Sequence, residues 1–501
     1  MRPLCIVLLT IVVVIVILIG ITIWASLQKK SRRDCLFSIY TTSARSGLQN
    51  VTRKPFVVVS MTTVPWRLHR LPSRIRDLLL TNSKIDKIQI NLPHQSRRTQ
   101  KPYPATPKDL ENNPKVVIHR CEDYGPITKV VPTAEQWFDK GTKANPTLIV
   151  SLDDDIGYDK SFVDKCVDAW QRECFDDEIL LPVGTQTMKY FGSHLPYLEG
   201  FRGVTYPASI FTPKLIQELK NISQNDLVPC DKSDDIVLAF MLPREGVSFW
   251  SKNLKIKYDI KQSEGDKQGL KQGNHKRNYA LCLNNLRRRY PFPVHFIHFA
   301  NGEWKEGKLP KKWENTLTKW KEARAQMRLW TPLECDTLMK QFFGNVYGTY
   351  QKALPIQKCD MARYAILFVF GGLYSDLDCT PVNDAAPNHI EGIAAKNQRA
   401  GKPRDVGFIE TTLDKPILKI DGSYEDPVRV ANYVIYAPKG SAWMRQSVNE
   451  AAKRLQKFGY AKSNTLYTTG PDVVTSLAQT LNVPIVTHQT LFHHSFDGKW
   501  K

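Results

Sequence analysis

The chain has 501 residues, of which 70 are lysine or arginine and 49 are aspartate or glutamate, so its formal net charge is +21. This basicity suits anionic substrates or the anionic headgroups of a membrane. Nucleic acid is the next candidate, but the sequence contains no recognised nucleic-acid-binding motif, so we expect no such partner. The ten cysteines are scattered without close pairs, which argues against a disulfide framework and against a Cys-x-x-Cys zinc site.

The N-terminal end of the chain predicts a membrane-spanning segment. Residues Leu4–Ala25 form an apolar run of about the length that crosses a bilayer. The run is longer than the core of an ordinary signal peptide, so we expect an uncleaved anchor over residues 1–27 and a polar stalk over residues 28–54. A signal peptide cleaved near Ala25 is the alternative. One arginine precedes the span and four basic residues between Lys29 and Arg33 follow it, so the positive-inside rule favours a cytosolic body.

About 470 residues follow the anchor, which is enough for two or three domains. The continuous apolar run Phe56–Ser60 is typical of a parallel strand that is buried on both faces. Strands and helices then alternate, which predicts a doubly wound α/β sheet whose ligands lie at the carboxyl ends of its strands. The other expected strands are Lys87–Leu92, Val116–His119 and Thr147–Leu152, and the expected helices are Ser73–Leu80 and Thr133–Lys140.

An acidic triplet, Asp153–Asp155, follows the last of these strands. The two-residue period of a strand places Asp153 and Asp155 on the same side. Paired carboxylates at the end of a buried strand are costly unless a cation lies between them. Hard oxygen ligands suit Mg²⁺ or Mn²⁺, so the pair predicts a divalent metal site.

Two further loops are expected to reach the same edge of the sheet. The tight turn before the helix at Thr133 ends in Lys129, which is well placed to meet a diphosphate. Thr62 and Arg67 lie in the loop after the first strand, and we expect them to contact the same ligand.

A second acidic pair, Asp234 and Asp235, immediately precedes a helix expected over Ile236–Met241. Carboxylates at a helix start can act as a general base, or they can simply cap the helix, and both interpretations stay open. With the strand-end Asp-x-Asp and the loop Glu199–Pro207, this arrangement resembles the inverting, family-2-like transferases of the GT-A fold. The resemblance implies a metal ion on the Asp153 pair and an acceptor hydroxyl deprotonated by Asp235 or Asp234. A folded relic without activity is the alternative.

The composition changes between the two halves of the body. The polar, glycine-dotted stretch Gln262–Arg277 predicts an exposed flexible loop, and Pro291–Pro293 marks the boundary that we expect between domains at residues 55–290 and 291–501. The second domain is expected to repeat the strand–helix architecture. Its expected strands are Val294–Phe299 and Met327–Trp330, and its expected helices are Pro310–Gln326 and Leu333–Phe343.

The stretch Gln357–Cys379 carries the most specific signal in the chain. Its first half predicts a helix with Asp360, Arg363 and Tyr364 on one face, and Gly371-Gly372 ends that helix where a positive φ is needed. A short strand is expected over Leu373–Asp378. Its period places Asp376 and Asp378 on one side, as a second pair of carboxylates that suits a divalent cation.

This string resembles the Asp-x-x-Arg-Tyr-(apolar)-Gly-Gly-Tyr-x-Asp-x-Asp block of the DXD-containing sugar transferases, glycosyltransferase family 32, with Leu373 as one extra residue. The resemblance implies that Asp378 and Asp376 hold Mn²⁺ or Mg²⁺, that Asp360 contacts ribose or sugar hydroxyls and that Arg363 contacts a phosphate or sugar. Val430–Tyr433 matches the donor-side asparagine loop of the family, and the terminal His493 resembles its closing histidine. The segment Ile297–Trp304 lacks the glutamine that the family usually has there, which weakens a nucleotide contact at that position.

Taken together, these features predict two GT-A-like domains in tandem behind an N-terminal transmembrane helix. The residues expected to bind a nucleotide-sugar are Thr62, Arg67, Lys129, Asp153, Asp360, Arg363, Tyr364, Asp376 and Asn432. The expected metal ligands are Asp153, Asp155, Asp376, Asp378 and His493, and the expected catalytic residues are Asp235 and Asp234.

The resemblances imply a metal-dependent transferase that moves sugars from nucleoside-diphosphate sugars to a glycan acceptor, with a retaining C-terminal domain and an inverting N-terminal one. They also imply a Golgi- or ER-type membrane with a lumenal body, whereas the charges that flank the apolar run favour a cytosolic one. The alternatives are one active domain beside an inactive sugar-binding domain, a metal-dependent phosphodiesterase or phosphatase, and a non-catalytic sugar-binding scaffold.

Overall fold

The computed structural model describes most of the chain beyond residue 52. The described residues are 53–142, 144–174, 178–181, 187–190, 193–196, 198–224, 229–251, 253–259, 275–300, 302–399, 402–412, 428–487 and 491–495. The expected anchor, nearly all of the stalk and most of the polar loop at 262–277 lie outside them. Among these residues, no helix has both the length and the apolar character that a membrane span requires.

The N-terminal part of the chain is built on one seven-stranded sheet. Its strand order is β10-β6-β9-β4-β1-β2-β3, and β1, β2, β3 and β4 are mutually parallel while β9 runs antiparallel to β4 and β6. The strands are β1 (Phe56–Thr62), β2 (Lys87–Pro93), β3 (Val116–Cys121), β4 (Thr147–Ser151), β6 (Glu178–Leu181), β9 (Val204–Pro207) and β10 (Ser248–Ser251). The four strands expected from apolar runs are therefore confirmed. Two small ribbons, β5 (Gly157–Tyr158) with β11 (Tyr258–Asp259) and β7 (Thr187–Tyr190) with β8 (Ser193–Pro196), lie outside this sheet.

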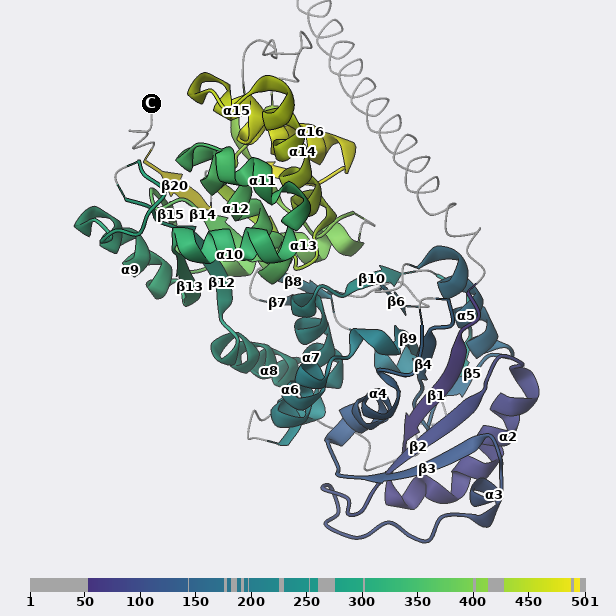
Figure 1. Ribbon diagram of the computed structural model, residues 1–501. Coiled ribbons are helices and arrows are strands. Elements are labelled where there is room, and N and C mark those ends of the chain that lie inside the picture. The colour runs from purple at the N-terminus through teal and green to yellow at the C-terminus, as the bar shows by residue number, and fades with distance from the viewer. Residues whose placement is uncertain are drawn as a thin grey trace, which may run out of the picture.

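Helices cover both faces of this sheet, as the doubly wound interpretation requires (Figure 1). Leu148 and Val150 of β4 pack into the core on one face, while Ile149 packs into the core on the other. This burial on both sides explains why the strand is apolar throughout. The first face carries α2 (Leu71–Thr81), α3 (Lys108–Glu111) and α5 (Phe162–Glu173), and the second carries α4 (Val131–Trp137), α6 (Pro213–Gln224), α7 (Asp234–Met241) and α8 (His275–Arg289).

The C-terminal part has its own four-stranded sheet, in the order β13-β12-β14-β18. These strands are β12 (Phe292–Ile297), β13 (Ala325–Trp330), β14 (Gly372–Ser375) and β18 (Val434–Ala437). Helices again pack on both faces. One face carries α10 (Pro332–Phe342), α11 (Gly344–Lys352), α12 (Pro355–Phe370), α14 (Ala442–Phe458) and α16 (Pro471–Thr480), and the other carries α9 (Glu314–Glu322) and α13 (Ala386–Arg399). The remaining elements are α15 (Thr465–Thr468), the pair β15 (Cys379–Pro381) with β20 (Phe492–His494), and the sheet of β16 (Gly407–Thr412), β17 (Val428–Val430) and β19 (Ile485–Thr487).

The two main sheets share one strand arrangement. In the first, β1 has parallel neighbours β2 and β4, and an antiparallel β9 follows β4. In the second, β12 has parallel neighbours β13 and β14, and an antiparallel β18 follows β14. A central strand whose connections leave to opposite sides creates a crevice at the carboxyl ends of the strands, where α/β proteins bind ligands. The acidic pairs follow β4 and β14, so each lies beside such a crevice.

The two parts of the chain are in direct contact (Figure 1). The Nη2 atom of Arg244 lies 2.9 Å from Oε1 of Glu391 in α13, and the Nζ atom of Lys439 lies 2.9 Å from Oε2 of Glu245. Both ion pairs join residues of the N-terminal part to residues of the C-terminal part.

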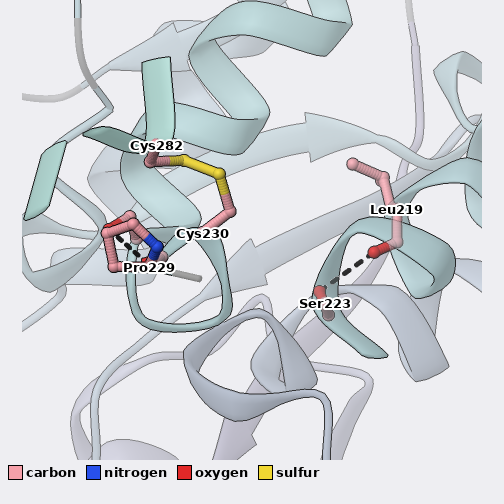
Figure 2. Close-up of a disulfide and its surroundings, with 6 residues drawn as sticks. Leu219, Ser223, Pro229, Cys230 and Cys282 are labelled. Carbon is pink, nitrogen blue, oxygen red and sulfur yellow. Dashed lines mark hydrogen bonds between the residues drawn. A yellow bond between two sulfur atoms is a disulfide. The ribbon is translucent and has the colours of Figure 1, made fainter. Parts of the chain in front are cut away.

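The scattered cysteines argued against a disulfide framework, but the described residues do contain one disulfide. Cys230, in a short 3-10 turn, is bonded to Cys282 of α8, and their Cα atoms are 4.7 Å apart (Figure 2). The two cysteines are 52 residues apart in the sequence, and only the packing of this turn on α8 brings them together. The spacing of cysteines along a chain carries no information about such a contact.

The carboxylate pairs Asp153/Asp155 and Asp376/Asp378 lie after the ends of their strands rather than within them. β4 ends at Ser151 and β14 ends at Ser375, so the expected strand over Leu373–Asp378 is shorter than predicted. The backbone N–H of Cys379 donates to the carbonyl oxygen of Asp376, which closes the turn. The positive φ expected at Gly371 and Gly372 is confirmed, with values of 68° and 102°.

Candidate active sites

The turn after β14 presents two carboxylates at the carboxyl edge of the C-terminal sheet. The Tyr374 hydroxyl donates to Oδ1 of Asp376 at 2.7 Å, and Nε2 of His494 lies 3.1 Å from Oδ1 of Asp378. The side chain of Asp376 is 32% exposed and that of Asp378 is 16% exposed, so both carboxylates can be reached by a ligand. Burial raises the pKa of Asp376, and the neighbouring Arg363 opposes that shift.

A buried ion-pair network lies directly behind these carboxylates. Arg363 and Asp360 come from one turn of α12, and Nη2 of Arg363 lies 3.0 Å from Oδ1 of Asp360. The same guanidinium donates to the carbonyl oxygen of Asn432 at 2.7 Å and lies 3.4 Å from Asp376. Asp360 also accepts hydrogen bonds from the Asn432 amide at 3.0 Å and from the Thr469 hydroxyl at 2.8 Å.

This network gives a physical reason for these residue types at these spacings. Burial raises the pKa of Asp360 to about 6, while Arg363 and two hydrogen bonds favour the ionised carboxylate. Asp360 and Arg363 are almost fully buried, so they hold Asn432 and Asp376 in place from behind. The Tyr364 hydroxyl donates to the carbonyl oxygen of Thr469 at 2.7 Å, which fixes the turn between α15 and α16.

The histidine at this site is His494 rather than the expected His493. β20 pairs with β15, and successive side chains of a strand point to opposite faces. His494 therefore faces Asp378 and stacks on Tyr433, with ring centroids 3.9 Å apart, whereas His493 is exposed. The sequence offered two adjacent histidines, and only the strand register selects between them.

The donor set around the turn suits a hard divalent ion. It consists of two accessible carboxylates, Asp376 and Asp378, with the imidazole of His494 beside them. The part of the chain that the structure describes holds no group of three or more His, Cys, Asp or Glu residues arranged as a complete metal site. A complete protein cage is not required, because Mg²⁺ typically takes one or two carboxylates together with substrate phosphates.

The N-terminal candidate site is organised around a buried lysine. Nζ of Lys129 lies 2.8 Å from Oδ1 of Asp153 and 3.0 Å from Oδ2 of Asp234. Burial lowers the pKa of Lys129, but Asp153, Asp234 and Asp235 outweigh that effect and raise it well above its usual value. Lys129 is therefore a permanent ammonium group that links the loop after β4 to the start of α7.

The other two members of the acidic triplet bind a different cation. Arg67 lies 3.2 Å from Asp154 and 2.5 Å from Asp155, so Asp153 and Asp155 do not share one partner in this structure, contrary to the two-residue period. The Thr63 hydroxyl donates to Asp154, whereas the expected Thr62 donates to the carbonyl oxygen of Asn91 at 2.9 Å.

Asp235 stands apart from these ion pairs. Its Oδ1 accepts the backbone N–H of Gly200 at 2.9 Å, and the Tyr279 hydroxyl lies 3.5 Å from its Oδ2. Burial raises its pKa well above the usual range, and the adjacent Asp234 adds to that shift. Ser233 is the residue that precedes the helix, and the ion pair of Asp234 and the hydrogen bond of Asp235 both go to groups outside α7. The simple capping interpretation is therefore not supported.

The loop Glu199–Pro207 does reach this site, and a glycine makes the approach possible. A Cβ atom on Gly200 would lie 2.7 Å from Nζ of Lys129 and 3.0 Å from Oδ1 of Asp235, both too close for ordinary contact. A cavity of about 540 Å³ adjoins the site, and Asp153, Asp154 and Tyr258 are among its lining residues. Such a volume is in the range of small-molecule binding sites.

Sequence reasoning missed several members of the two sites. Tyr374 lies inside the stretch Gln357–Cys379, two residues before Asp376, and Thr469 belongs to a Thr-Gly-Pro sequence typical of a turn before a helix, so both carry a local signal. Tyr158, whose hydroxyl accepts the backbone N–H of Asp153, and Tyr279 carry no local signal, because only the fold brings them to these carboxylates.

Residues 310–398 match the family described as "Glycosyltransferase sugar-binding region containing DXD motif". The chain is 35% identical over 83 residues to inositol phosphoceramide mannosyltransferase 1 of Schizosaccharomyces pombe, a match that covers 15% of this chain and 25% of the relative. It is 26% identical over 169 residues to the initiation-specific alpha-1,6-mannosyltransferase of Candida albicans, covering 32% of this chain and 42% of that relative. The matches thus span less than half of each relative.

Among solved structures, the PaToxG glycosyltransferase aligns with 44% of this chain and 80% of its own, at 15% identity and a TM-score of 0.25, which is too low to carry an argument. The family match encloses α12 and the turn that presents Asp376 and Asp378. Through this region, the chain is similar to the glycosyltransferases that carry a DXD sugar-binding region.

Proposed function

We propose that the C-terminal part transfers a sugar, with mannose as the first candidate, from a nucleoside-diphosphate donor to a glycan acceptor. The observation that carries this proposal is the pair of accessible carboxylates, Asp376 and Asp378, held in front of the buried Arg363–Asp360 pair. The two mannosyltransferase relatives support the sugar class.

The main barrier to sugar transfer is the charge that builds on the departing diphosphate. Asp378 and Asp376 would hold Mn²⁺ or Mg²⁺ beside the donor phosphates, and the ion would supply Lewis-acid stabilisation of that charge. Arg363 neutralises Asp376 from behind and fixes its carboxylate, so that the site is organised before the donor arrives. Asn432 is held by both Asp360 and Arg363, and by resemblance we assign it to the donor side. By resemblance, this transfer retains the anomeric configuration.

We propose that the N-terminal part is a second, inverting transferase domain, with domains at residues 55–290 and 291–501. The shared strand arrangement supports this tandem, because it puts an acidic turn at the same topological position in both sheets. Asp235 acts as the general base, since a buried carboxylate with a raised pKa is a stronger proton acceptor than an ordinary one. Asp153 and Asp155 would hold the divalent ion that accompanies the donor diphosphate, and Lys129, which is paired with Asp153 and Asp234, would supply positive charge beside that diphosphate.

The test is a donor screen followed by single-site variants. The full chain is incubated with each nucleotide-sugar and Mn²⁺, and nucleotide release and product linkage are measured. Asp378→Ala should abolish one linkage and Asp153→Ala another. Identical defects in the two variants would contradict the tandem proposal, and donor hydrolysis at the same rate without any acceptor would favour a phosphodiesterase.

We further propose a membrane-anchored protein whose body lies in the lumen of a Golgi- or ER-type compartment. The Cys230–Cys282 disulfide supports this placement, because disulfides persist in oxidising compartments. The sequence contains two glycosylation sequons, Asn50-Val-Thr52 and Asn221-Ile-Ser223. Asn221 is a poor acceptor in the folded protein, since the Ser223 hydroxyl is buried and donates to the carbonyl oxygen of Leu219 (Figure 2). Glycosidase-sensitive modification at Asn50 would support a lumenal body, and an unmodified Asn50 with reduced cysteines would contradict it.

A further inference from the structure

A cavity of about 320 Å³ lies where the N-terminal and C-terminal parts meet. Its walls include Phe240 and Arg244 from the N-terminal part, and Pro293, Gly372 and Tyr436 from the C-terminal part. Pro293 and Gly372 lie at the starts of β12 and β14, whereas Asp376 and Asp378 follow the end of β14. The cavity is therefore on the opposite edge of the sheet from the candidate transfer site, and none of the residues assigned to either candidate active site lines it.

The lining is rich in arginine and has an excess of positive charge. Arg244, Arg289 and Arg404 line the cavity, and Glu391 is the one carboxylate among the described lining residues. Glu391 is already shared by two cations, because Oε1 lies 2.9 Å from Arg244 and Oε2 lies 3.6 Å from Arg287. The charges of Arg289 and Arg404 therefore have no carboxylate of the cavity wall to balance them.

Arg404 points to an anionic ligand. Arg404 donates a hydrogen bond to the Tyr436 hydroxyl, which opposes the rise that burial causes in the pKa of that hydroxyl. One part of the guanidinium is therefore already engaged. Its Nε and Nη1 atoms are buried and make no hydrogen bond within the described protein. Buried donors without a partner are costly, and a phosphate oxygen is a strong acceptor for guanidinium nitrogens.

Aromatic rings supply the rest of the wall. Phe292 and Tyr436 are stacked with centroids 5.9 Å apart and planes inclined by 16°, and the guanidinium of Arg244 lies 3.9 Å above the ring of Phe240. Flat apolar surfaces beside guanidinium groups are the surroundings in which proteins hold a ring that bears a phosphate. We propose that this junction cavity binds a nucleotide-class ligand, a phosphate attached to a planar base, at a site separate from both transferase centres.

Because residues of both parts line the cavity, an occupant makes contacts that exist only when the two parts are docked. A ligand that binds the folded protein raises its apparent stability by mass action. The proposal therefore predicts saturable stabilisation by a nucleotide without any divalent ion, in contrast to donor binding at the DXD turn, where the metal ion bridges the phosphates.

The experiment is a calorimetric and thermal-unfolding titration of the full chain in EDTA, with GMP, guanosine and inorganic phosphate as probes. GMP should bind saturably and raise Tm, while guanosine and phosphate bind at least tenfold more weakly. Arg404→Gln should weaken GMP binding at least tenfold, and Arg289→Gln, at an exposed position, should weaken it severalfold without risk to folding. The exposed Arg445→Gln is the charge-matched control and should bind as the wild type does.

The site is distinguished from the transfer site by the variant Asp378→Ala, which should abolish transfer and leave GMP binding in EDTA unchanged. The proposal is overturned if the wild type shows no saturable GMP binding in EDTA, or if Arg404→Gln and Arg289→Gln bind GMP like the wild type. Equal affinity for phosphate and GMP would also overturn it, since the aromatic wall would then contribute nothing.

Discussion

The guanidinium of Arg363 lies 3.4 Å from the carboxylate of Asp376, although α12 and the turn after β14 present them from different elements. The same side chain is bonded to Asp360 and to the backbone of Asn432, so one cation fixes the positions of three partners. The central turn of the site is thus held by a group that is itself inaccessible to a ligand.

The substitution Arg363→Lys should abolish most of the C-terminal activity. A lysine keeps the charge but cannot donate in three directions from a planar group, so Asp360 and Asp376 lose their common partner. We expect kcat to fall by about 100-fold or more, the size seen when a preorganised charged contact is lost. The free energy of unfolding should fall by about 3 kcal/mol, because a buried ion pair is broken on one side. Steady-state kinetics and urea unfolding measure both effects, and the exposed Arg445→Lys is the control; a variant with normal kcat would contradict the assigned role.

The two adjacent histidines should behave differently. His494→Ala removes the group beside Asp378 and the ring stacked on Tyr433, so we expect weaker Mn²⁺ binding, seen as a raised metal concentration at half-maximal rate. His493→Ala changes an exposed side chain and should leave the metal titration as in the wild type. The same effect in both variants would show that the strand register at β20 is not what determines the contact.

Gly200→Ala should selectively damage the N-terminal site. The added methyl group would meet Nζ of Lys129 and Oδ1 of Asp235, so one of these groups must move. We expect loss of the linkage made by the N-terminal site and a stability cost of about 1–3 kcal/mol, as is usual for overpacking. Gly348→Ala is the matched control, because a Cβ there meets nothing within 4 Å and alanine favours the helix α11. Product analysis and thermal unfolding of the two variants decide the outcome; a fully active Gly200→Ala protein would contradict the close approach.

The Cys230–Cys282 disulfide should contribute measurably to stability. It closes a loop over a sequence separation of 52 residues and ties the segment before Asp234 to α8, which also carries Tyr279. The double variant Cys230→Ser/Cys282→Ser should lose about 2–4 kcal/mol of unfolding free energy. In denaturant titrations, reductant should lower the unfolding free energy of the wild type and leave that of the double variant unchanged. Equal reductant responses would mean that the bond does not form in the isolated protein.

Asp405 should make the stability of the protein depend on pH in the acid range. Burial raises the pKa of its carboxyl to about 6, and the Ser441 hydroxyl that caps α14 donates to it. A pKa that is higher in the folded state means that folding favours the protonated group. The corresponding stability is therefore fully present below about pH 4 and is lost as pH rises through 6.

Relative to wild type, Asp405→Asn should be more stable above pH 6, by at most about 3 kcal/mol, and equally stable near pH 4. The difference between the two unfolding free energies, measured from pH 4 to 8, isolates this group from all others that titrate. A flat difference would show that the carboxyl is not perturbed by its burial.

Much of the fold could be predicted because its signals are local. Phe56–Ser60 is apolar throughout because both faces of β1 are covered, and Gly371-Gly372 ends α12 because the backbone needs a positive φ there. Asp360, Arg363 and Tyr364 come from one helix, α12, as their spacing in the sequence indicated.

The contacts that complete the two sites could not be predicted, since each joins residues that only folding brings together. Lys129 enters the space between Asp153 and Asp234, Cys230 meets Cys282, and Asp378 receives His494 rather than its neighbour. By itself, the sequence determined which segments become strands and helices and which carboxylates end two of the strands. The tertiary structure alone decided which cation or histidine faces each carboxylate, because those pairings depend on strand register and helix packing across tens to more than one hundred residues of chain.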